Sequence, residues 1–66
     1  MSLIDKYFIG NNKSNFWKDV KIKITEVYNY GVEFLMYDDN DKEVAVCTMA
    51  TSEFNKLFSE VADGKV

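Results

Sequence analysis

The side chains best suited to chemistry are lysines that alternate along one stretch beside aromatic residues. Lys21 and Lys23 lie two positions apart, Lys18 precedes them, and Trp17 and Tyr28 are near in the sequence. Lysines on one strand face can hold a nucleic-acid backbone while aromatic rings stack on the bases. An ordinary solvated strand has the same pattern, and a formal net charge of −3 without any Arg weakens nucleic-acid binding. Single-stranded nucleic-acid binding through these residues is therefore the alternative function.

Carboxylate and amide oxygens are densest in the stretch 38–43, which reads Asp-Asp-Asn-Asp-Lys-Glu. Such oxygens are the ligands that Ca²⁺ and Mg²⁺ prefer. The helix-flanked calcium loop is not matched, because no Gly occupies its sixth position. Asp and Asn are also the usual residues of tight turns. We expect a solvated hairpin turn at Asp38 to Glu43, with a divalent-ion site as the open alternative.

The chain lacks the groups that most enzymes need. Cys47 is the only cysteine and there is no His to activate it, so we expect a small buried residue rather than a nucleophile. No two carboxylates have clearly contrasting surroundings, and no glycine motif for phosphate binding occurs. The sequence therefore predicts no enzyme activity, no metal and no cofactor.

A chain of 66 residues forms one domain, 1–66, with a small core. A single Cys excludes an intrachain disulfide, and the absence of His argues against structural zinc. Self-association remains as a means of stabilisation, so we expect a homodimer. One Cys suits a reducing compartment, and neither a signal peptide nor a membrane-spanning apolar run is visible. We expect a cytoplasmic protein without a membrane partner.

Three stretches alternate apolar and polar residues at the period of a β-strand. They predict strands at about 16–27, 32–37 and 42–49, with a bulge near Glu26 and turns at 28–31 and 38–41. One face of this sheet should be buried. The side chains expected on it are Val20, Ile22, Ile24, Val32, Phe34, Met36, Val44 and Val46.

Helices are predicted at both ends. The pairs Leu3–Tyr7 and Ile4–Phe8 are four apart, which indicates a short helix over 2–9 that ends at Gly10, with disorder of residues 1–15 as the alternative. A second helix should begin at a Thr51 or Ser52 cap and end at Gly64. Its apolar positions are Phe54, Leu57, Phe58, Val61 and Ala62. The sequence therefore predicts an α+β fold (α-β-β-β-α): a three-stranded antiparallel meander with the C-terminal amphipathic helix packed on one face.

The second face of the predicted sheet is also partly apolar. Either the N-terminal helix or a partner must cover it, and Tyr and Met are favoured at protein interfaces. The leading prediction is a non-enzymatic module that binds a larger protein, with inhibition of that protein as a further expectation. Its expected anchors are Tyr28, Tyr30, Leu35, Tyr37 and Met49, with Ala45 and Cys47 on the same face.

A small acidic chain whose basic residues are all lysines resembles, in general character, proteins encoded by phages and mobile elements of AT-rich bacteria. Many of those bind and block a host or defence protein. The resemblance concerns size and composition and involves no motif. It implies an inhibitor of a host or defence protein.

Overall fold

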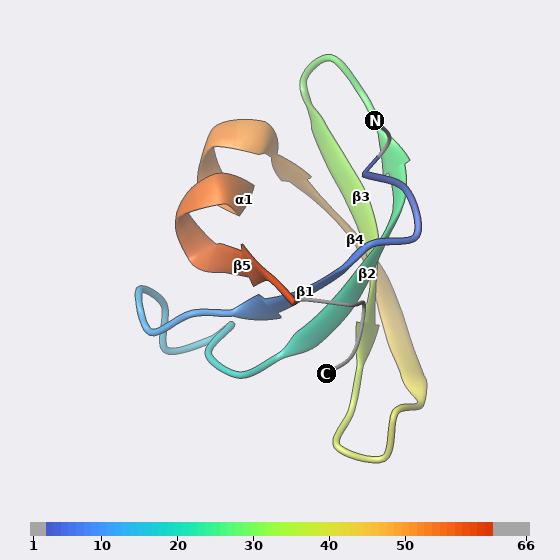
Figure 1. The fold of residues 1–66 in the computed structure, drawn as a ribbon, viewed down its shortest axis with the longest axis vertical. Coiled ribbons are helices and arrows are strands. Elements are labelled where there is room, and N and C mark those ends of the chain that lie inside the picture. The colour runs from blue at the N-terminus through green and yellow to red at the C-terminus, as the bar shows by residue number, and fades with distance from the viewer. Residues whose placement is uncertain (1–2, 62–66) are drawn as a thin grey trace.

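Five antiparallel strands form one sheet in the order β4-β3-β2-β1-β5 in the computed structural model, which describes residues 3–61 (Figure 1). One helix connects β4 to β5. The predicted Ala62 and Gly64 at the end of the second helix lie outside the described residues. The elements are β1 (Tyr7–Gly10), β2 (Lys21–Val27), β3 (Gly31–Tyr37), β4 (Glu43–Ala50), α1 (Thr51–Leu57) and β5 (Phe58–Glu60). The fold is α+β, as expected.

The three predicted strands are present as β2, β3 and β4, but the sheet is larger than a three-stranded meander. Its register shifts between Ile24 and Glu26, close to the expected bulge. Ile22, Ile24 and Phe34 are fully buried, as their alternation with polar residues indicates. The prediction of a three-stranded sheet was wrong because both ends of the chain add a strand.

The N-terminal segment contributes a strand where a helix was predicted. β1 pairs with β2 on one side and with β5 on the other. Phe8 is buried, and a Cβ atom on Gly10 would overlap the backbone carbonyl of Trp17. Gly10 is therefore required by the close approach of the 11–20 segment, rather than as the end of a helix.

The second helix begins near the predicted residue but is much shorter. Its N-cap is Ala50, without a side-chain hydrogen bond, so neither Thr51 nor Ser52 caps it. Phe58 is extended, with φ −128° and ψ 147°, and the chain continues as β5. Asn11 ends the helix, because its backbone N–H donates to the carbonyl of Leu57 at 2.8 Å.

Aromatic rings from distant parts of the chain fill the space between the sheet and α1. Phe54 of α1 lies 5.0 Å from Phe8 and 4.9 Å from Phe58, measured between ring centroids. Edge-on and stacked aromatic pairs add to the stability that burial supplies. The core is confined to one face of the sheet, and it consists of Phe8, Ile22, Ile24, Val32, Phe34, Phe54 and Phe58.

The predicted phase of β4 was wrong. Phe34 lies opposite Cys47, and Val32 lies opposite Met49. Opposite residues of an antiparallel pair share a face, so Cys47 and Met49 lie on the core side. The register also shifts between Met36 and Tyr37. Val44 and Val46 consequently point outward and are 57% and 60% exposed.

Candidate functional site

The turn between β2 and β3 is a tight hairpin. Tyr28 and Gly31 exchange both backbone hydrogen bonds, at 2.7 and 3.4 Å. A Cβ atom on Gly31 would overlap the carbonyl oxygen of Met49 on β4, so the strands could not approach this closely with another residue there. Among the described residues other than glycine, Asp5, Asp19 and Asp41 have positive φ. Asn29, in the centre of the turn, therefore does not have the left-handed conformation that Asn tolerates.

Two tyrosine rings stack at the tip of this hairpin. The ring centroids of Tyr28 and Tyr30 are 5.2 Å apart and their planes differ by 5°. Tyr30 is 70% exposed, and the neighbouring Val27 is 46% exposed. We call Tyr28 and Tyr30 the tyrosine patch. It joins two of the predicted anchors in one exposed aromatic surface.

Two carboxylates flank the tyrosine patch. Glu26 lies directly opposite Glu33 in the β2–β3 ladder, and like charges in such a pair repel. The hydroxyl of Thr25 donates to a carboxylate oxygen of Glu33 at 2.7 Å. Glu33 is the main cause of a raised pKa at Tyr28, with smaller effects from desolvation, Glu26 and Tyr30. The patch thus has a negative potential that favours cations.

Leu35 and Tyr37 occupy the outer face of the sheet, farther along β3. Leu35 lies between Lys23 and Val46, and Tyr37 lies opposite Lys21. Both side chains are half-buried. Met49, the fifth predicted anchor, packs against the core instead, so its grouping with Leu35 and Tyr37 on one face was wrong.

The predicted nucleic-acid residues are divided between the two faces. Trp17 packs against the core, with its ring centroid 5.7 Å from Phe34 and 5.3 Å from Phe58. Lys21 and Lys23 pair across the ladder with Tyr37 and Leu35 on the outer face. The lysines are therefore near tyrosine and leucine side chains, while Trp17 is used in packing.

One ion pair limits the free positive charge of the predicted nucleic-acid residues. Lys21 forms an ion pair with Asp41 of the β3–β4 turn. Lys18 is exposed in the 11–20 segment, where its backbone N–H donates to the carbonyl of Ser14 at 3.1 Å. Lys23 also lies on the outer face, and within residues 3–61 it takes part in none of the ion pairs.

The acidic stretch after β3 forms the expected turn. A carboxylate oxygen of Asp38 accepts the backbone N–H groups of Asn40 and Lys42, at 2.8 and 3.0 Å. Asp41 has a φ of 62° and pairs with Lys21. Within residues 3–61 no three Asp, Glu, Cys or His side chains are placed to share a cation. The carboxylate of Asp38 organises the turn itself.

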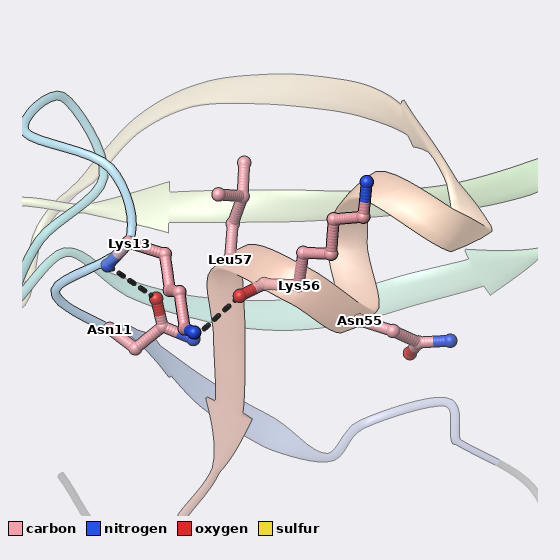
Figure 2. A pocket seen from close by; sticks show the side chains of 5 residues that line it. All are labelled: Asn11, Lys13, Asn55, Lys56 and Leu57. Atoms are coloured by element: carbon pink, nitrogen blue, oxygen red, sulfur yellow. Dashed lines mark hydrogen bonds between the residues drawn. The ribbon is translucent and has the colours of Figure 1, made fainter.

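A surface hollow lies where the 11–13 segment meets the end of α1 (Figure 2). The side-chain amide of Asn11 donates to the carbonyl of Lys56 at 2.8 Å and accepts the backbone N–H of Lys13 at 2.9 Å. Figure 2 shows the amine of Lys56 pointing away from Asn11. The amide nitrogen of Asn11 thus binds the end of the helix while its oxygen holds the 11–13 segment, and the two lysines do not converge.

No protein-family model, curated protein or solved structure matches this chain. Across residues 3–61, the helix is too short and polar to cross a membrane.

Sequence reasoning missed the exposure of Val27, Val44 and Val46. Val27 breaks the alternation of its strand, and after the bulge it lies opposite the buried Val32. It is exposed because it is the last residue of β2. The run from Val44 to Ser52 contains no charged side chain. That run could have indicated an unprotected strand edge.

Proposed function

We propose that this chain is a non-enzymatic protein-interaction module that binds a larger protein and blocks the surface it covers. The tyrosine patch is the observation that carries the proposal. Tyrosine is enriched among the residues that dominate binding energy, and interface centres favour aromatic side chains. A stacked pair with Tyr30 70% exposed gives the fold little stability through burial, so binding is the better explanation of its presence.

The hairpin presents these rings in a fixed arrangement. The two-residue loop is closed by both hydrogen bonds between Tyr28 and Gly31, and the Thr25–Glu33 hydrogen bond joins the strands beneath it. A binding surface that is ordered before association loses less conformational entropy on binding. The tip of the hairpin is therefore suited to insertion into a pocket or groove of the partner.

The charge around the patch indicates the chemistry of the partner. Glu26 and Glu33 repel one another in the free protein. A lysine or arginine of the partner would relieve this repulsion and could also lie over a tyrosine ring. We therefore infer a partner surface that combines an apolar pocket with basic side chains.

Leu35 and Tyr37 form a second zone on the outer face, and they would extend the contact along β3. Inhibition follows where the covered surface of the partner is functional. The resemblance in size and composition to phage and mobile-element proteins supports a host or defence protein as the target. The single Cys supports action in the cytoplasm.

Affinity capture with two matched alanine variants tests this proposal. Tyr30 and Phe16 are 70% and 69% exposed, so Tyr30→Ala and Phe16→Ala remove aromatic rings of similar exposure. Proteins captured from cells that naturally make the chain should be retained by wild type and Phe16→Ala and lost with Tyr30→Ala. Equal capture by both variants would remove the tyrosine patch from the proposal. Circular dichroism should show that each variant is folded.

Single-stranded nucleic-acid binding is the second candidate, because Lys21 and Lys23 lie on the same face as Tyr7 and Tyr37. Titration with a fluorescently labelled oligonucleotide at low and high salt distinguishes it. Binding that weakens steeply with salt would support this candidate, and Lys23→Glu should abolish it while Lys13→Glu leaves it unchanged. No binding at low salt would eliminate it.

A further inference from the structure

The free side of β4 carries regularly spaced hydrogen-bonding groups. Tyr28 and Gly31 exchange both backbone bonds, so the backbone groups of Gly31 point to β2. Because these directions alternate along a strand, those of Val32 and Phe34 point to β4. The backbone N–H and C=O groups of the opposite residues, Met49 and Cys47, must point back to β3. Those of Val46 and Thr48 are therefore directed away from the sheet.

The side chains along this edge do nothing to repel another strand. Val44, Val46 and Thr48 are exposed. Proteins commonly protect edges with charged residues, proline or bulges. No charged residue occurs from Val44 to Ser52 and the chain has no Pro, and the register shift of β4 lies before Ala45, near the start of the strand. β4 is also eight residues long, which is long enough for stable pairing.

We propose that β4 pairs antiparallel with β4 of a second copy of this chain, about a two-fold axis at Cys47. Val46 of one copy then exchanges hydrogen bonds with Thr48 of the other, and the two sheets become one continuous sheet. Cys47 lies directly opposite Cys47 of the second copy in a non-hydrogen-bonded position. Side chains approach most closely at such positions.

The edge is complementary to itself, which favours a second copy over a foreign strand. In this register each outward-directed residue meets an outward-directed residue, as a two-fold interface requires. Val44 lies opposite Ala50, and Glu43 opposite Thr51, so no two like charges meet. The interface therefore avoids the repulsion that two acidic chains would otherwise feel.

Light scattering with two valine-to-lysine variants tests the interface. Wild type should have twice the 7.7 kDa mass of the chain from micromolar to hundreds of micromolar concentration. Val46→Lys should be monomeric over that range, whereas Val27→Lys, the same change at an exposed site on β2, should stay dimeric. A monomeric wild type would overturn the proposal and leave the edge to a foreign strand. A dimeric Val46→Lys would also overturn it.

Oxidative cross-linking tests the register without altering the edge. Diamide takes two electrons and two protons from the two Cys47 thiols, which leaves one disulfide between the copies. Wild type should form a covalent dimer rapidly, while Cys47→Ser combined with Asn55→Cys, an exposed helix position, should not. Equal rates for the two proteins would mean random collision and would contradict the register.

The two surfaces proposed for this chain can be separated experimentally. Tyr30→Ala should stay dimeric and lose the captured partner. Val46→Lys should be monomeric and retain the captured partner in the absence of coupling between the sites. A Tyr30→Ala variant that dissociates would place the dimer contact at the hairpin tip and overturn pairing through β4.

Discussion

The two edges of the sheet are built in opposite ways. β5 has three residues, and Glu60 within it pairs with Lys6 at 3.3 Å. β4 has eight residues and no charged side chain after Glu43. Short length and charge are devices that prevent strands from joining, and only β5 uses them. The difference is consistent with the proposed pairing through β4, because the same chain closes its other edge with charge and a short strand.

The helix between these edges accounts for part of the contrast. α1 starts directly after β4 and ends directly before β5, so it ties both edges to the core (Figure 1). Phe54 is its buried residue. The outward face of β4 lies on the opposite side of the sheet from this contact. The core can therefore be complete while the β4 edge remains free.

Phe54→Ala should have the largest effect, because it removes the attachment common to both edges. Loss of a fully buried Phe costs about 3–5 kcal/mol of unfolding free energy. Phe54 is 2% exposed and contacts the rings of Phe8, Phe34 and Phe58. Urea unfolding should show this loss, with Asn55→Ala within about 0.5 kcal/mol of wild type. A loss below about 1 kcal/mol would mean that α1 is held by other contacts.

Gly10→Ala should selectively damage the β5 side. The new methyl group would overlap the Trp17 carbonyl, and such overpacking costs about 3 kcal/mol. Thermal unfolding should reveal the loss. Ala45→Gly on β4 is the control and should cost about 1 kcal/mol or less. Equal effects of the two changes would argue that the 11–20 segment moves easily away from β1.

Amide hydrogen exchange should distinguish the two edges at single residues. Ser59 of β5 pairs with Ile9 of β1, so the amide of Ser59 should exchange slowly in every variant. The amide of Thr48 should be slow in the wild-type dimer and at least about tenfold faster in monomeric Val46→Lys, since it then faces water. Nuclear magnetic resonance at matched concentrations measures both. Rapid exchange of the Thr48 amide in wild type would show that the β4 edge is unpaired and would contradict the proposed dimer.

Lys6→Ala should have the smallest effect. The Lys6–Glu60 pair is partly exposed, with side-chain exposures of 32% and 50%, and such pairs contribute about 0–1 kcal/mol. The loss should shrink further at high salt. A reduced thermal midpoint at low salt that vanishes at high salt is the expected result. A salt-independent loss would point to the packing of the lysine stem instead.

The central strands could be predicted because Ile22, Ile24, Val32 and Phe34 are buried with a period of two. The N-terminal strand could not, because Leu3–Tyr7 and Ile4–Phe8 satisfy helical spacing by chance in a segment whose strand has four residues. The position of β1 depends on pairing with β5, which is distant in sequence. Local patterns carry no information on such pairing.

The phase of β4 could not be predicted from its alternation alone. Alternation fits either face, and a one-residue displacement reverses every side chain. Val46 faces outward because it lies opposite Leu35, and Val44, two residues away, faces the same side. The exposure of Tyr28 and Tyr30 was predictable, since they flank a turn, but their stacking and the inward position of Met49 required the three-dimensional register.

The packing of Trp17 makes the chain its own optical reporter. It is the single tryptophan, and it lies edge-on to Phe34 and tilted against Phe58 at the start of β5. Release of β5 would expose the indole to water, and its emission should move to longer wavelength. Pairing or dissociation at the β4 edge should leave that emission unchanged. Tryptophan fluorescence therefore reports on the β5 side of the sheet and not on the β4 edge.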